Sequence, residues 1–125
     1  MHSKKNLLSL GGGIGGLLSG LALCHGWFLF MWLGIALLWF VSRNIFAGFL
    51  WGLIAVLVSH GWLLALHPLE WIGVPSPLSL PIAMAIWLCC GAAGGLLVGI
   101  WSWIGNSFLF LGLRDGGFLE KTLFA

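Results

Sequence analysis

Four long apolar stretches, separated by charged residues, prolines and short polar segments, dominate the hydropathy pattern of the chain. They run Leu7–Leu23, Trp27–Val41, Ile45–Leu66 and Leu80–Ile104. A helix needs roughly 20 residues to cross the hydrocarbon core of a bilayer. None of the stretches alternates as a strand would, and lipid-exposed backbone must satisfy its hydrogen bonds internally. The pattern predicts an all-α, polytopic membrane protein with about four transmembrane helices.

The second stretch, Trp27–Val41, is short for a crossing and would need flanking residues or a thinned bilayer. Between the third and fourth stretches, the segment from His67 to Pro81 contains four prolines, which disfavour helix continuation. It is expected to form an ordered turn outside the membrane, anchored by Trp71. After Gly105, a polar break at 114–117 separates two short apolar pieces. We therefore expect a four-helix transmembrane region over 1–104 and a cytoplasmic tail, or the truncated start of a further helix, over 105–125.

Composition agrees with membrane residence. The 125 residues are 61% hydrophobic and only 6% charged, whereas a soluble domain carries about 25% charged residues. Nine tryptophans suit the headgroup layer, where the apolar ring and its N–H are both satisfied. The formal charge of +2 is too small to indicate nucleic-acid binding.

The basic residues predict the orientation of the helices, because they tend to remain on the cytoplasmic side. If each stretch crosses once, all five lie on one side of the membrane, and the opposite side receives the His67–Ser79 loop with Glu70 as its only formal charge. Both termini are therefore expected to be cytoplasmic. The five are Lys4, Lys5, Arg43, Arg114 and Lys121.

Glycines recur at four-residue spacing in three of the stretches. Small residues in this pattern let helix backbones approach closely, which is a main source of helix association in lipid. The pattern favours packing within the chain or against another subunit over a lipid or substrate slot. The glycines are Gly12, Gly16 and Gly20 in the first stretch, Gly48 and Gly52 in the third, and Gly91, Gly95 and Gly99 in the fourth.

Two further N-terminal patterns are best read as structural. Gly11, Gly13 and Gly16 match GxGxxG, but no strand precedes them and no acidic residue follows at the spacing of a nucleotide fold. Lys4 and Lys5 before an apolar run that ends at Cys24 resemble a lipoprotein signal. Leu23 is larger than the residue that normally precedes the modified cysteine, so an uncleaved first helix is favoured.

Candidate chemistry is sparse. His60, His67 and Glu70 are a titratable cluster near one membrane face, and metal or proton-relay chemistry competes there with plain interfacial capping. Whether the three meet in space is left open. Vicinal Cys89 and Cys90 lack a second ligand pair, so they are interpreted, with Cys24, as helix-packing cysteines. We assign no catalytic, cofactor-binding or metal-binding residue and expect no cofactor.

Three runs resemble the N-terminal membrane region of apolipoprotein N-acyltransferases. They are Gly48–Phe49–Leu50–Trp51–Gly52, Gly61–Trp62, and Trp71–Ile72–Gly73–Val74–Pro75–Ser76–Pro77. The order of features also resembles that family: a Gly-rich helix, a Trp-rich helix, a basic link, a third helix, a Pro-containing loop and a small-residue helix. The resemblance covers nearly the whole chain.

The resemblance implies a bacterial-type plasma (inner) membrane location and a role in lipoprotein maturation. The family transfers an acyl chain from phospholipid to a lipoprotein N-terminal cysteine, using Cys, Glu and Lys of a nitrilase-like domain. That domain lies beyond the part of the family that this chain resembles, so no catalytic residue is carried over. We expect a truncated or split member, inactive alone, with membrane lipids as partners, and with phospholipid and lipoprotein as substrates only within a longer enzyme.

Two other functions remain as alternatives. A complete small accessory subunit or assembly factor would associate with helix partners through the glycine stripes. A small oligomeric channel or transporter is motivated by the polytopic form, but the stretches lack embedded charges that would define a pathway.

Overall fold

The computed structural model describes the backbone of residues 2–123 and the side-chain surroundings of residues 3–108. The chain is helical almost throughout, and the described residues contain no strand. The predicted all-α class is therefore confirmed. The elements, in chain order, are α1 (His2–His25), α2 (Phe28–Val41), α3 (Ile45–Ser59), the short 3₁₀ helices η1 (Gly61–Leu66) and η2 (Leu69–Ile72), and α4 (Ser76–Leu123).

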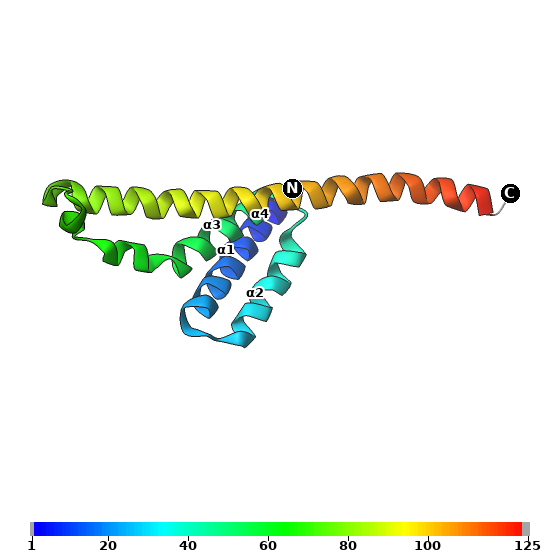
Figure 1. Cartoon of the computed structure of the whole chain (residues 1–125). Helices are drawn as coiled ribbons and strands as arrows, with labels where there is room; N and C mark the ends of the chain where they lie inside the picture. The colour runs from blue at the N-terminus through cyan, green and yellow to red at the C-terminus, as the bar shows by residue number, and fades with distance from the viewer. Residues whose placement is uncertain (1, 124–125) are drawn as a thin grey trace.

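Helix α3 occupies the centre of the bundle. It packs against α1 on one side and α4 on the other, while α2 packs mainly against α1. In Figure 1, α1 and α2 form a hairpin, and α4 runs past α3 and then extends beyond the other helices toward the C-terminus. The hairpin turns at Gly26, whose φ of 69° suits a residue without a side chain. Asn44 caps α3, because its side-chain oxygen accepts from the backbone N–H groups of Phe46 and Ala47.

Close packing at the glycines is confirmed, and it takes place within the chain. A Cβ added to Gly12 or Gly16 would overlap backbone atoms of α3. On the other side of α3, a Cβ on Gly52 would overlap the backbone of α4 at Gly94, which the spacing pattern did not single out. Gly99 is looser, since its added Cβ would lie 3.6 Å from Phe49. The stripes thus bring three helices of one chain to backbone contact.

The third apolar stretch does not form one helix. The α-helix ends at Ser59, and Gly61–Leu66 continues as the 3₁₀ helix η1. The expected single helix from Ile45 to Leu66 is corrected accordingly. The physical reason is local: the Ser59 hydroxyl donates to the Val56 carbonyl and pairs with the ring of His60, which competes with further α-helical bonding just before the flexible Gly61.

The fourth helix is longer than the pattern predicts. It begins at Ser76 and includes Pro77 and Pro81, so the expected loop to Pro81 is wrong at its end. Pro77 lies in the first turn, where proline is tolerated because its missing N–H would have no partner within the helix. Pro81 lies further inside the helix, where proline removes one backbone hydrogen bond. The helix also continues through 114–117, where a polar break is expected. The side chains of Arg114 and Lys121 lie outside the described ones, so their place on the cytoplasmic side stays a prediction.

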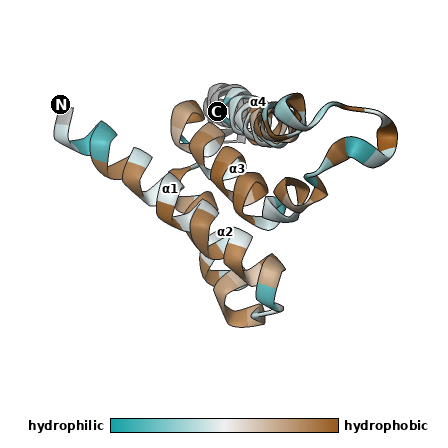
Figure 2. Ribbon diagram, turned by 90° about the vertical axis from the view of Figure 1, so that its left-hand side faces the viewer, coloured by the Kyte–Doolittle hydropathy of each residue, from teal (hydrophilic) through white to brown (hydrophobic). Residues whose placement is uncertain are grey.

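The interior is built mainly from small side chains, and many of the large apolar side chains face outward. Val41 is the largest fully buried side chain, together with Ser19, Ser79 and Ser102, whereas Trp39 and Phe40 are about three-quarters exposed. Figure 2 shows hydrophobic colour over much of α1, α2 and α3. Water would strongly disfavour such a surface, but lipid accepts it, and small interior residues are typical of helices that pack in lipid. The arrangement therefore agrees with a membrane protein.

Helix lengths bear on the number of crossings. Within the part of the chain that the structure describes, two segments, Ser3–His25 and Ser76–Phe108, are long and apolar enough to cross a membrane. Helix α2 has 14 residues, or roughly 21 Å at 1.5 Å per residue, against a hydrocarbon core of about 30 Å. Helix α3 with η1 is apolar over a longer path. Four crossings and the cytoplasmic position of both termini remain predictions.

Candidate functional site

The structure does not bring His60, His67 and Glu70 together as one site. The His60 ring pairs with the Ser59 hydroxyl at 2.9 Å, and the His67 ring pairs with the Ser79 hydroxyl at 2.8 Å. Glu70 instead accepts from the Ser76 hydroxyl. The seven-residue spacing of the histidines fails to place them together because the α-helix ends between them and a 3₁₀ turn has a different period. Among the described residues, no three metal-ligating side chains gather.

Ser79 is the residue that organises this end of the molecule. Its side chain is fully buried, and its hydroxyl accepts from the Leu69 backbone N–H at 2.6 Å while pairing with His67. Ser79 therefore ties η2 and the preceding loop to the first turn of α4. Sequence reasoning missed it, because a serine between prolines carries no distinctive signal.

We expect Ser79→Ala to lower the free energy of unfolding by about 1–2 kcal/mol, because the buried Leu69 N–H loses its acceptor. The measurement is a titration of the purified chain from mild detergent into dodecyl sulfate, followed by circular dichroism. Ser107→Ala is the matched control, since that exposed hydroxyl donates only to the carbonyl four residues earlier. Equal stability of the two variants would contradict the role of Ser79.

The three cysteines are free and lie apart from any histidine cluster in the described region. Cys24, at the end of α1, donates its thiol to the Val58 carbonyl of α3 at 3.3 Å. Cys89 and Cys90 both belong to α4. The contact of Cys24 supports the packing interpretation for that residue.

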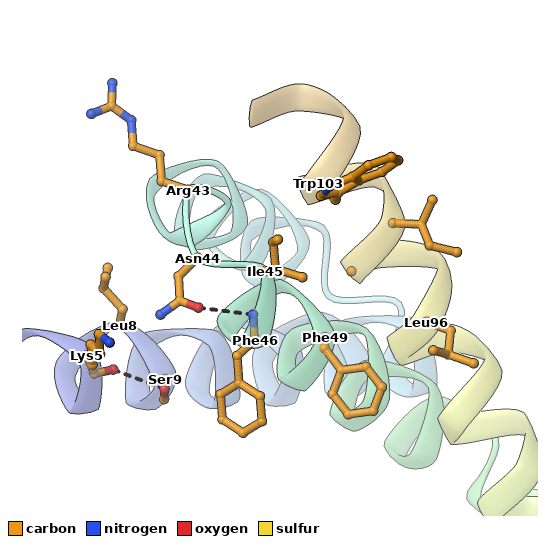
Figure 3. A pocket seen from close by; sticks show the side chains of 12 residues that line it. Lys5, Leu8, Ser9, Arg43, Asn44, Ile45, Phe46, Phe49, Leu96 and Trp103 are labelled. Atoms are coloured by element: carbon orange, nitrogen blue, oxygen red, sulfur yellow. Dashed lines mark hydrogen bonds between the residues drawn. The ribbon is translucent and has the colours of Figure 1, made fainter. Parts of the chain in front are cut away.

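The opposite end of the bundle carries a large open cavity, which we call the cationic groove. Its volume is about 1030 Å³. Lys5 comes from α1 and Arg43 from the turn between α2 and α3, while α3 and α4 supply apolar walls, as Figure 3 shows. The lining residues are Lys5, Leu8, Ser9, Arg43, Asn44, Ile45, Phe46, Phe49, Leu96, Gly99, Ile100 and Trp103.

Two of the basic residues used in the charge analysis line this groove, and their side of the membrane stays a prediction. Lys5 and Arg43, which the crossing count places on one side of the membrane, line the same cavity although 38 positions separate them in the chain. The Asn106 side chain also donates to the Arg43 carbonyl, so α4 reaches this end as well. The groove itself was not predicted, because its walls come from three helices.

The described part of the groove contains no recognisable nucleophile, base and orienting group. Ser9 donates its hydroxyl to the Lys5 carbonyl, and Asn44 is engaged in capping α3. The side chains that remain are cationic or apolar. Such an arrangement of cationic and apolar side chains can bind an amphipathic anion.

Comparison with known proteins gives a consistent result. The chain is 50% identical over 117 residues to the apolipoprotein N-acyltransferase of Prochlorococcus marinus (strain MIT 9313), covering 94% of this chain and 23% of that protein. It is 55% identical over 106 residues to the protein of the same name from a second strain of Prochlorococcus marinus (strain SARG), covering 85% and 22%. A third relative so named, from Parasynechococcus marenigrum (strain WH8102), is 53% identical over 89 residues, covering 71% and 19%.

The chain thus spans about a fifth of the length of the curated relatives it matches. No protein-family model matches it. No solved structure matches it.

Proposed function

Because this chain is a homologue of apolipoprotein N-acyltransferases over a segment equal to about a fifth of their length, we propose that it forms part of the membrane-embedded N-terminal region of such an enzyme. Its role is in lipoprotein maturation, where an acyl chain passes from phospholipid to the N-terminal cysteine of a lipoprotein. The chain lies in a bacterial plasma membrane as a multi-pass protein and supplies scaffold, while the reacting groups belong to the remainder of the enzyme.

One observation carries this proposal: the match of 50% identity runs along 94% of the chain. The match therefore includes the tightly packed α1, α3 and central part of α4 rather than one apolar helix that chance composition could imitate. The structure supports a scaffold role, because the side chains of Asn44, Ser79 and Glu70 serve a helix cap and loop contacts. We propose that the chain alone does not transfer acyl groups.

The accessory-subunit alternative relies on glycine stripes that are free to bind another protein. In the structure these glycines face helices of the same chain. No specific observation favours that alternative, and none favours a channel.

A chimera tests the proposal. The matching segment of the Prochlorococcus marinus (strain MIT 9313) relative is replaced by this chain, and the chimera is expressed in bacteria that lack their own enzyme. We expect acyl transfer to a lipoprotein N-terminal cysteine, detected by the mass of the N-terminal peptide, because helix packing within the segment is self-contained. This chain expressed alone should give no transfer.

A second chimera, carrying an unrelated four-helix membrane segment, is the matched control and should be inactive. A chimera with this chain that inserts in the membrane but does not transfer acyl groups would overturn the proposal. The DNA downstream of the coding region is an independent check. The absence of a nitrilase-like sequence there and elsewhere in the genome would also count against it.

A further inference from the structure

The cationic groove has a positive rim, and no acidic group lies near it among the described side chains. Lys5 and Arg43 are exposed at the rim, and none of the residues that line the groove is acidic. Among residues 3–108, the only carboxylate side chain is that of Glu70. Glu70 contacts Ser76 at the start of α4, and Trp103 lies 27 residues further along that helix, or roughly 40 Å at 1.5 Å per residue. The rim therefore attracts an anion.

The walls of the groove are apolar and aligned. Leu96, Ile100 and Trp103 share one face of α4, since they are spaced four and three residues apart, and each is about half exposed or more. Phe46 and Phe49 stand on one face of α3 by the same rule. The two apolar faces begin beside the basic rim and lead away from it.

A glycine keeps the groove open. Gly99 lies on α4 between the apolar side chains and lines the cavity. Unlike the glycines that touch neighbouring backbone, it has room for a Cβ, with Phe49 3.6 Å away. A large side chain at this position would project into space that an apolar ligand needs.

We propose that the cationic groove binds one anionic phospholipid, with the headgroup phosphate at the Lys5 and Arg43 rim and an acyl chain between α3 and α4. Lys5 and Arg43 both line the cavity, and their flexible side chains carry the donors that bind phosphate. The combination of positive rim and apolar walls fits a lipid better than a soluble anion, because only a lipid also carries an acyl chain that can pack against the walls. This binding goes beyond the proposed acyltransferase role and does not depend on it.

Lipid binding to the purified full chain in detergent tests the proposal, with native mass spectrometry as the readout. The probes are phosphatidylglycerol and phosphatidylcholine with identical acyl chains. We expect phosphatidylglycerol to bind more tightly, and we expect Lys5→Gln and Arg43→Gln each to weaken its binding about five-fold, the usual contribution of one cation near an anionic lipid. Lys4→Gln is the matched control, because Lys4 does not line the groove.

The apolar walls are tested by Gly99→Leu, which fills the groove, against Gly105→Leu, which lies on the same helix outside it. We expect only Gly99→Leu to abolish the preference for phosphatidylglycerol, while circular dichroism shows both variants folded. Should Gly99→Leu unfold, Ile100→Gln replaces it as the wall variant.

Several outcomes would overturn the proposal. Equal binding of the two lipids would show that the rim does not recognise an anionic headgroup. An equal effect of Lys4→Gln and Lys5→Gln would show that Lys5 has no special contact with the lipid. Displacement of the lipid by millimolar inorganic phosphate would show a site for the free anion. A shift from dimer to monomer in Gly99→Leu would show that a second copy of the chain, and not a lipid, fills the groove.

Discussion

Replacing Gly16 by alanine is expected to lower the free energy of unfolding by about 3 kcal/mol or more, a value at the upper end for overpacking. An added Cβ at this position overlaps the carbonyl of Trp51 in α3. The obstacle is backbone, which cannot rotate away as a side-chain tip can, so α1 and α3 must separate. The gain in helix propensity from glycine to alanine, about 1 kcal/mol, offsets only part of this cost.

Gly13→Ala is the matched control, on the same helix and three residues away. Its added Cβ meets only the end of the Ile54 side chain at 3.5 Å, an ordinary contact. We expect this variant to be neutral or slightly stabilised. Titration of both proteins into dodecyl sulfate, followed by circular dichroism, measures the difference. Equal stability of the two variants would show that α1 does not approach α3 through Gly16.

The second large effect is expected at the α1–α2 contact, where Gly34→Ala should cost about 2 kcal/mol. The added Cβ overlaps the Ser19 hydroxyl and lies 2.9 Å from the Gly15 carbonyl. Ser19 is fully buried, and its hydroxyl has no hydrogen-bond partner in the described structure. Ser19→Ala alone should therefore be neutral or stabilising, because it removes a buried polar group that nothing satisfies.

The double variant tests whether the two positions touch. Ser19→Ala with Gly34→Ala should lose about 1 kcal/mol less than Gly34→Ala alone, because the hydroxyl is gone while the Gly15 carbonyl still crowds the new methyl group. Strict additivity of the two substitutions in the same unfolding assay would place α2 away from Ser19. Ser42→Ala, just after α2, provides the background for a serine whose hydroxyl donates to the Trp39 carbonyl.

Much of the helical architecture could be predicted because its cause is local. Arg43, Asn44 and the segment after Leu66 interrupt the apolar runs. Each run between such interruptions predicts a helix, because in lipid the backbone must satisfy its own hydrogen bonds. Glycine spacing also predicts that another helix packs closely, since a helix face without side chains allows close backbone contact with any neighbouring helix. Gly94 escaped this reasoning, because its importance depends on Gly52 of another helix.

The polar groups were harder to place. His60 and His67 would share a helical face only if one α-helix continued through both. The 3₁₀ helix between them has a different period, so they do not. Ser79 stabilises this end of the molecule because the fold places the Leu69 N–H, ten residues away in the chain, within hydrogen-bond distance of its hydroxyl. The extension of α4 through 114–117 is a further case, because polar and glycine residues weaken a helix without forbidding it.

By itself, the sequence determined the all-α class, the small-residue contact surfaces and the kinship with a lipoprotein acyltransferase family, because each depends on residue type and spacing along one segment. Tertiary structure alone decided which helix each glycine faces, that three titratable residues take separate serine partners, and that Lys5 and Arg43 share one groove. These outcomes depend on how segments distant in the chain are brought together. The residue spacing within one helix does not specify which helix packs against it.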